Sequence, residues 1–344
     1  MAGIVIGTAA GVGLAATYLP SSPFAGQAPY SLSAELSQVA DRIGFSDEGR
    51  DIFLTTRPQL LDSSDFRKAC DETPDGSADG ELATVGCYYG LGESFGRIAI
   101  FRPGDARLAD QFVVTAAHEF LHAAYARMSA GEQARLDALL ETRWSTVAAD
   151  DPIQASLASS VGSSAENRAT EEFAYLGTEI ADAVDPALEA YYARYFRDRG
   201  ALVAIHDADR ALWDGLESDY SAKTDALAGT EQANAGASAQ LQADRAQLAD
   251  DRAWYNQQAD DYNALSPNDR ARTYVAADDG SAGDEPYGSY LARRLAEFAT
   301  READQSRRQL DLDAAEAVAT EARAEVERLY ADIEALSAAA VPAA

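Results

Sequence analysis

The sequence predicts an α+β fold that is mainly helical with a small sheet and ends in an antiparallel α-helical coiled-coil hairpin. Three observations support this prediction. Apolar residues recur at helical spacing in most segments between residues 31 and 216. Strand-like composition is confined to short runs rich in β-branched and aromatic residues. From about residue 221 the composition changes to Ala, Gln, Asp, Glu and Arg, which is typical of long solvated helices.

The first predicted helix covers residues 31–45. Its N-cap is Ser31 or Ser33, because either hydroxyl can accept a hydrogen bond from the free N–H groups of the first turn. A short strand is then expected at Asp51–Thr55 and ends before Pro58, which has no N–H to donate in a sheet.

The clearest strand is residues 96–101, GRIAIF, which Pro103 and Gly104 close. Directly behind it, residues 109–128 carry apolar side chains at helical spacing, and residues 129–148 form another amphipathic pattern. The predicted local architecture is therefore a strand that leads into a helix.

Residues 150–164 contain Ser and Gly and are interpreted as a connector. Residues 165–184 are predicted to be helical, because acidic residues in the first turn suit the positive end of the helix dipole. The helical pattern then continues over residues 186–216.

The last part of the chain has a heptad pattern. Its apolar positions step by three and four: Leu312, Ala315, Ala319, Ala322, Val326, Leu329, Ile333 and Leu336. A looser version precedes it at Ala237, Leu241, Leu248, Tyr255, Tyr262 and Leu265. Pro267 and Gly280 interrupt the helix between them, so residues 221–344 are expected to form a helical coiled-coil domain. An antiparallel hairpin is the simplest arrangement, and a parallel coiled coil between chains is the alternative. Either form predicts self-association or a partner helix.

The chain has 344 residues and a formal net charge of −29. Such a charge argues against nucleic acid and anionic lipid headgroups as partners, because both attract basic surfaces. Much of it is interpreted as solvated helix surface.

The first 17 residues carry no charge and are followed by a polar, proline-bearing stretch. We interpret residues 1–20 as a secretory signal or a short membrane anchor, although no Lys or Arg precedes the apolar run. The protein is then extracytoplasmic, either secreted or in contact with the membrane through its N-terminus. A buried N-terminal helix is the alternative.

The two cysteines, Cys70 and Cys87, bracket a polar segment rich in Gly and Asp. A disulfide between them would restrict the unfolded chain by about 3 kcal/mol and would persist only in an oxidising compartment. Two unrelated buried thiols are the alternative. Two cysteines alone cannot form a tetrahedral zinc site.

Two of the three histidines in the chain, His118 and His122, stand four residues apart with Glu119 between them. A helix turns 100° per residue, so the two imidazoles face one side, roughly 6 Å apart along the axis, and can bind one metal ion. Glu119 is turned toward the same space. Zinc lowers the pKa of a bound water to about 7, and a carboxylate beside it can take the proton. The spacing thus predicts metal-assisted hydrolysis.

The sequence HEFLH resembles the zinc metallopeptidases of the HExxH class, the zincins. The metzincin branch is excluded, because Tyr125 and Met128 stand where its glycine and third histidine would be. The remaining histidine, His206, is interpreted as a core or surface residue.

The gluzincin branch takes its third ligand from a glutamate on a later helix, and TEEFAYLG is similar to its pattern. The resemblance implies Glu171 as the third ligand, with Glu172 as the rival and Glu166 as a more distant candidate. Tyr175, one turn beyond Glu171, is implied as a group that contacts a ligand or stabilises the substrate oxyanion.

The resemblance implies that residues 21–220 form a zincin-like zinc metallopeptidase domain. Zn²⁺ would be its cofactor and a peptide or protein its substrate, with Glu119 activating the zinc-bound water. By the same analogy, an extended substrate would bind along the edge of strand 96–101. Two other functions stay open: an envelope scaffold with a structural or vestigial metal site, and a zinc hydrolase that cleaves another amide, such as a cell-wall peptide.

Overall fold

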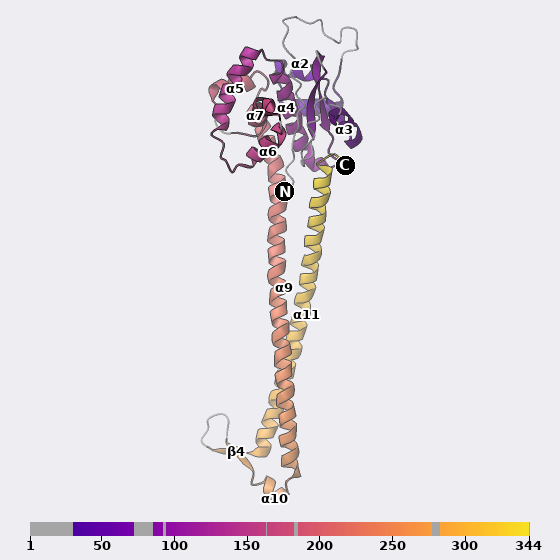
Figure 1. Cartoon of the computed structure of the whole chain (residues 1–344). Coiled ribbons are helices and arrows are strands. Elements are labelled where there is room, and N and C mark those ends of the chain that lie inside the picture. The colour runs from indigo at the N-terminus through magenta and orange to yellow at the C-terminus, as the bar shows by residue number, and fades with distance from the viewer. Residues whose placement is uncertain are drawn as a thin grey trace. The chain divides into compact units, whose positions relative to one another are not determined.

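The computed structural model describes residues 30–71, 85–91, 94–162, 164–181, 185–276 and 283–343 (Figure 1). The chain forms two compact units. The first consists of Met1–Leu216 together with Ala331–Ala344, and the second of Glu217–Tyr330. The predicted signal or anchor at residues 1–20 lies outside the described residues. Within the described part, no helix is both long and apolar enough to span a membrane.

The described chain is mostly helical with a small sheet, as the sequence predicts. The sheet of the first unit has three strands, β1 (Gln59–Leu61), β2 (Gly86–Leu91) and β3 (Ser94–Phe101). Their order is β1-β3-β2, with β1 parallel and β2 antiparallel to β3. The strand predicted at residues 96–101 is confirmed as part of β3. It is the central strand of the sheet. β2 pairs with it on one side, and β1 pairs on the other side with residues 99–101 only, so the edge that was predicted to bind substrate is occupied at those three residues.

The prediction of a strand at Asp51–Thr55 is wrong, because these residues belong to helix α2 (Asp47–Thr55). Ser46 caps this helix by accepting a hydrogen bond from the N–H of Gly49, and acidic residues occupy its first turn. These start signals outweigh the β-propensity of the apolar run behind them. The actual strand, β1, begins immediately after Pro58.

Two further helices belong to the first unit, α1 (Ala34–Ile43) and α3 (Ser63–Asp71), and α3 packs against β1 and β3. Ser33 rather than Ser31 is the N-cap of α1, where its hydroxyl accepts from the N–H of Leu36. The helix ends at Gly44 in the left-handed conformation, with φ at 72°.

The predicted disulfide is present between Cys70 on α3 and Cys87 on β2. Phe66, Cys87, Ala99 and Phe101 form a small core on the face of the sheet that α3 covers. The disulfide therefore ties β2 to the helix behind it.

The central helix α4 (Ala109–Tyr125) covers the other face of the sheet and follows a 3₁₀ turn at Ala106–Leu108. It lies between the strands and helix α7 (Figure 1). Every residue from Gln111 to Ala124 is buried. A helix that is enclosed on all sides carries whatever polar residues it has into the interior.

Four shorter helices complete this unit: α5 (Ala130–Trp144), α6 (Pro152–Val161), α7 (Arg168–Thr178) and α8 (Pro186–Tyr192). The connector expected at residues 150–164 is mostly helix α6. Asp151 caps it, Pro152 occupies its first turn, and Ile153 and Leu157 bury one face. The Ser-rich composition led to the prediction of a connector, because only a short apolar stripe indicates this helix.

The helix predicted at residues 165–184 is shorter in the structure, because a 3₁₀ turn at Ala165–Asn167 precedes α7. The pattern at residues 186–216 contains two helices rather than one. α8 ends at Tyr192, and a bridge between Phe196 and Phe45 separates it from the next helix.

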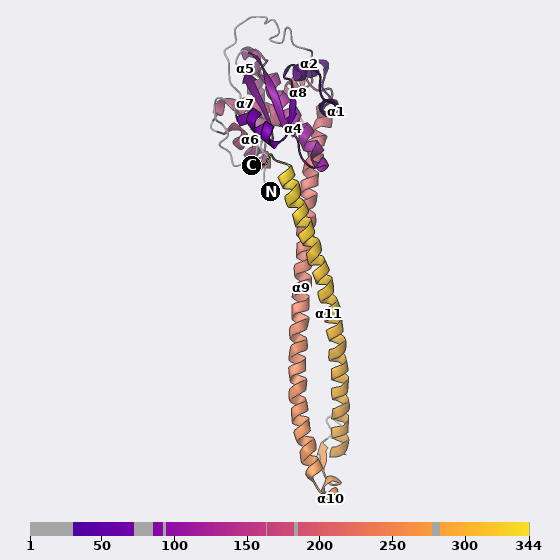
Figure 2. The ribbon, with the colours of Figure 1, turned by 90° about the vertical axis from the view of Figure 1, so that its right-hand side faces the viewer.

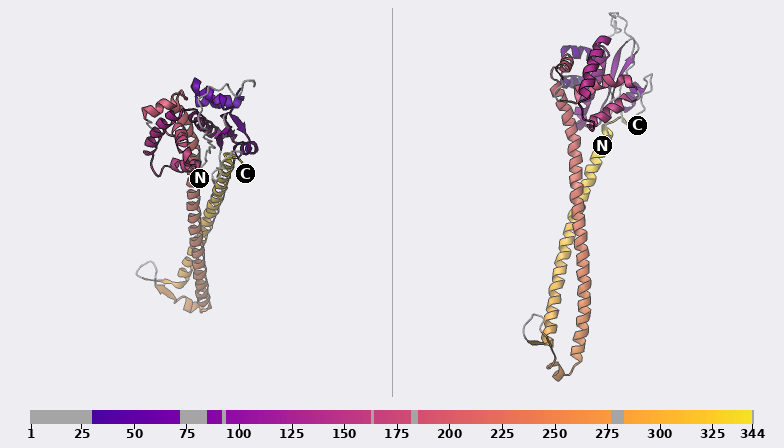
Figure 3. Two further views of the ribbon diagram at one scale, coloured as in Figure 1. Left: turned by 45° about the horizontal axis from the view of Figure 1, so that its top comes forward. Right: turned by 60° about the vertical axis from the view of Figure 1, so that its left-hand side comes forward.

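The second unit contains most of two long helices, α9 (Arg199–Ala264) and α11 (Tyr287–Ala339). Between them lie α10 (Pro267–Arg270) and a two-stranded sheet of β4 (Tyr274–Ala276) and β5 (Asp284–Pro286). Within the unit the two helices run side by side in opposite directions (Figures 2 and 3).

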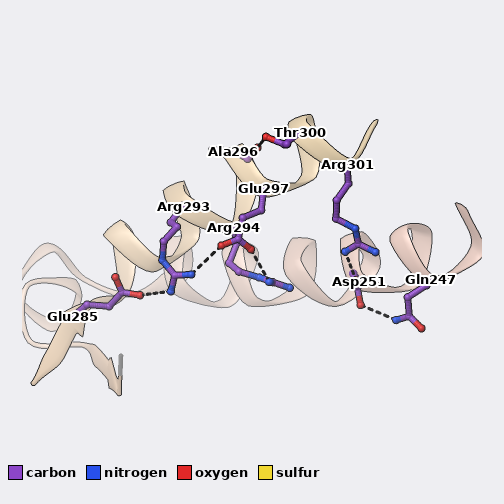
Figure 4. A network of polar contacts seen from close by, with 9 residues as sticks. All are labelled: Gln247, Asp251, Glu285, Arg293, Arg294, Ala296, Glu297, Thr300 and Arg301. Atoms are coloured by element: carbon purple, nitrogen blue, oxygen red, sulfur yellow. Dashed lines mark hydrogen bonds and ion pairs between the residues drawn. The ribbon is translucent and has the colours of Figure 1, made fainter. Parts of the chain in front are cut away.

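Ion pairs connect the two antiparallel helices. Lys223 contacts Glu325 at 2.6 Å, and Arg301 contacts Asp251 at 2.5 Å (Figure 4). The apolar seam between the helices includes buried residues Leu241, Leu248, Phe298, Leu312 and Ala319. Most positions of the predicted heptad are buried or half-buried, whereas Ala237 and Leu265 are exposed. An antiparallel helix pair is therefore the arrangement within one chain.

The start of α9 and the end of α11 belong to the first unit. Leu336 and Ala340, near the end of α11, are buried against Leu108, with Leu212 and Leu216 of α9 packed beside them. The Gln111 side chain on α4 donates a hydrogen bond to the Ala340 carbonyl at 3.1 Å. The last residues of the chain thus complete the unit that carries the histidines.

Candidate metal centre

His118 and His122 lie one turn apart on α4, with only 0% and 1% of their surface exposed. Their ring centroids are 4.9 Å apart. The spacing of four residues places both imidazoles on one side of the helix. Because α4 is enclosed on all sides, this pair faces the interior of the unit.

Glu171 on α7 approaches both imidazoles. Its Oε2 lies 3.4 Å from Nε2 of His118, and its Oε1 lies 3.7 Å from Nε2 of His122. Gly177 on the same helix allows the close packing, because an added Cβ there would lie 2.5 Å from the Leu121 side chain on α4. The structure therefore brings together three side chains from two helices, although Glu171 follows His122 by 49 residues in the sequence.

One nitrogen of each histidine and one oxygen of Glu171 all lie within 4.8 Å of one another. Three ligands about 2.0–2.1 Å from one tetrahedral ion would lie roughly 3.4 Å apart, which is close to the contacts between Glu171 and the two imidazoles. Two imidazoles and a carboxylate are donors that suit zinc. The donor set and its spacing thus fit a zinc ion.

The protonation state of His122 agrees with this fit. Burial, and then the neighbouring His118, lower the pKa of His122 well below its usual value. The imidazole is consequently neutral, which is the form that binds a metal. The neutral imidazole of His122, beside the Glu171 carboxylate, offers a lone pair for a cation to occupy.

Glu119 is fully buried on α4 beside this group. Neither of its carboxylate oxygens has a hydrogen bond of ordinary geometry among the described residues. Burial raises its pKa well above the ordinary value, the charge of Glu171 raises it further, and the backbone amide of Tyr88 opposes both. A buried carboxyl without an ordinary hydrogen bond lowers folding stability. Its presence here therefore indicates a chemical role for Glu119.

Gly86 on β2 makes room for this carboxyl. A Cβ at that position would lie 2.8 Å from Oε1 of Glu119 and 2.6 Å from the Thr115 methyl. The backbone of β2 therefore runs directly against the Glu119 side chain.

Tyr175 lies on α7 one turn beyond Glu171, and its ring packs edge-on against His118 with centroids 4.7 Å apart. Its hydroxyl is 2.8 Å from the Ser160 hydroxyl on α6. Burial raises the pKa of Tyr175 well above its usual value, and Glu179 and Glu171 add to this effect. The ring is thus placed beside a candidate ligand, while the hydroxyl is engaged by α6.

The other candidates lie apart from the group. Glu172 is buried but contacts Arg168 at 2.8 Å, and Glu166 is exposed on the 3₁₀ turn before α7. His206 on α9 lies 3.8 Å from Glu179, and burial lowers its pKa to about 4. Among the described residues, the group that could hold a metal ion consists of His118, His122 and Glu171.

Two residues of the site were missed in the sequence. Thr170 on α7 contacts His122, and Gly86 on β2 contacts Glu119. Thr170 immediately precedes Glu171, which is the only sequence signal for it. Nothing in the sequence relates Gly86 to the histidine helix, because sheet packing brings them together.

Comparisons with protein-family models, with curated proteins and with solved structures each return no match for this chain.

Proposed function

We propose that the protein is a zinc-dependent metallopeptidase of the zincin type, with His118, His122 and Glu171 as metal ligands and Glu119 as the general base. One observation carries the proposal. Two imidazoles and a carboxylate converge within 4.8 Å, and a second carboxyl, that of Glu119, is buried beside them without an ordinary hydrogen bond among the described residues. A purely structural site needs the three ligands but has no use for Glu119.

A zinc ion held by these residues would supply Lewis-acid chemistry, polarising the scissile carbonyl and making water more acidic. Glu119 would take the proton from the attacking water and pass it to the leaving amine. Burial raises the pKa of Glu119, so its ionised carboxylate is a stronger base than that of an ordinary glutamate. Tyr175 would hold the ring of His118 by edge-to-face packing.

The substrate would lie along β2. This strand pairs with β3 on one side, and among the described residues no strand pairs with its other side. An extended peptide can add to such an edge through main-chain hydrogen bonds. Because Gly86 of β2 lies against Glu119, a peptide on this edge would pass close to the base.

The disulfide supports an extracytoplasmic location, because such bonds persist in oxidising compartments. We therefore propose that the protein acts outside the cytoplasm, secreted or held at the membrane by its N-terminus.

The test is proteolysis of a peptide library and of casein by the purified chain, with its metal content measured by mass spectrometry. We expect zinc in the protein and cleavage that a chelator abolishes. Glu119→Gln should keep the zinc and the fold while losing cleavage. Glu166→Gln, which alters an exposed acid outside the group, should keep both. Full activity of Glu119→Gln would refute the general-base role.

A second candidate function is that of an envelope scaffold. The antiparallel pair of α9 and α11 favours it, because a long helix pair can bind a partner helix. Bound zinc without chelator-sensitive cleavage of any peptide or cell-wall amide would support the scaffold. Cleavage of a cell-wall peptide, without cleavage of casein or of the peptide library, would instead identify a cell-wall amide as the substrate.

A further inference from the structure

The two imidazoles of the candidate metal centre are held in different ways. The Nδ1 atom of His118 has no hydrogen-bond partner among the described residues, and its ring rests against Tyr175. The Nδ1 atom of His122, in contrast, lies 2.8 Å from the Thr170 hydroxyl. Only one of the two rings thus has a directional contact on its second nitrogen.

Thr170 is well placed to orient a ligand. It is 5% exposed and stands next to Glu171 on α7, so the same turn of helix presents the third ligand and the contact to His122. A hydroxyl this deeply buried makes a hydrogen bond that water does not compete for. The position of Thr170 relative to Glu171 is fixed by the helix backbone.

The contact has a chemical consequence. When Nδ1–H of His122 donates to the Thr170 oxygen, the proton is absent from Nε2, and the lone pair of Nε2 points toward Glu171, 3.7 Å away. Without the hydroxyl the ring can turn over or take the other tautomer, and either change removes the lone pair from the group.

We propose that Thr170 is a positioning residue that fixes the tautomer and the ring orientation of His122 for metal binding. This inference rests on the metal centre proposed above. Contacts of this kind to ligating histidines typically change metal affinity by about 10- to 100-fold.

The test compares three variants of the full chain. Thr170→Val keeps the shape of the side chain and removes the hydroxyl, and Thr170→Ser restores a hydroxyl. Thr178→Val is the matched control, because Thr178 is also buried on α7, and its hydroxyl donates to the Ala174 carbonyl of its own helix.

Zinc affinity is measured by competition with a chromophoric chelator. We expect Thr170→Val to bind zinc about 10- to 100-fold more weakly than the wild type, and Thr170→Ser and Thr178→Val to bind within a few-fold of it. Equal affinity of Thr170→Val and the wild type would overturn the inference while leaving the metal centre intact. A wild-type chain that binds no zinc would instead remove the metal centre itself.

A second measurement does not depend on loaded metal. Nitrogen-15 NMR of the imidazoles in the metal-free wild type should show His122 protonated on Nδ1. The same ring protonated on Nε2 in the wild type would contradict the proposal, even if Thr170→Val proved too unstable to purify.

Discussion

Substitution of Gly86 by Ala should separate catalysis from metal binding. The added Cβ would lie 2.8 Å from Oε1 of Glu119 and 2.6 Å from the Thr115 methyl, distances that ordinary Cβ contacts do not reach. The Glu119 side chain must then move, and none of the three atoms nearest to the new methyl group belongs to a proposed metal ligand. Overpacking of this kind costs about 1–3 kcal/mol of folding stability. A displacement near 1 Å of a catalytic group can lower the rate by about 100-fold.

The assay for Gly86→Ala is the rate of peptide cleavage together with zinc affinity and urea unfolding. We expect cleavage to fall by about 100-fold and zinc affinity to stay within a few-fold. Gly49→Ala is the control for strain, because its Cβ would lie 2.3 Å from the Tyr195 carbonyl oxygen, away from the site. Gly131→Ala is the control without strain, since its nearest neighbour is 3.8 Å away. If Gly86→Ala cleaved as fast as Gly131→Ala, the placement of Glu119 as base would be refuted.

Three further predictions concern stability. Replacing both Cys70 and Cys87 by Ser should lower the free energy of unfolding by about 3 kcal/mol, because the disulfide closes a loop with a separation of 17 residues; an unchanged urea midpoint would contradict this. Ending the chain near residue 220 should cost about 3–5 kcal/mol, because it removes buried Leu336 and the hydrogen bond to Ala340. Replacing residues 217–330 by a short Gly-Ser linker should leave thermal unfolding of the first unit nearly unchanged. If this chain and the chain that ends near residue 220 melted at the same temperature, the stabilising role of residues 331–343 would be refuted. Burial raises the pKa of Glu179 to about 8, so the folded state binds more protons than the unfolded state between about pH 4.5 and 8, and stability falls as the pH rises through that window. Glu179→Gln should lack this part of the pH dependence in urea unfolding, and identical slopes for variant and wild type would show that Glu179 titrates normally.

The sequence predicted most of what local patterns determine. The strand at residues 96–101, the histidine helix behind it and the heptad in α11 have strong periodicity, and each is present. The strand expected at Asp51–Thr55 failed because a Ser46 cap and an acidic first turn favour helix over a short apolar run. Such competition between signals of similar strength is decided by tertiary packing.

The histidine pair could be read from spacing, because four residues on a helix define one face. The spacing could not decide between Glu171 and Glu172 as the third ligand, because neighbouring residues differ by only 100° of rotation on a helix. Both side chains are also buried in the structure. What separates them is the packing of α7 on α4, which turns Glu171 toward the imidazoles and leaves Glu172 beside Arg168. Thr170 and Gly86 depend on the same long-range packing.

The most direct test of the metal centre is a crystal structure of the zinc-loaded full chain, with diffraction measured on both sides of the zinc absorption edge. We predict one strong anomalous peak about 2.0–2.2 Å from Nε2 of His118, Nε2 of His122 and a carboxylate oxygen of Glu171. A zinc peak at any other position, or a first coordination sphere that omits Glu171, would contradict the proposed centre.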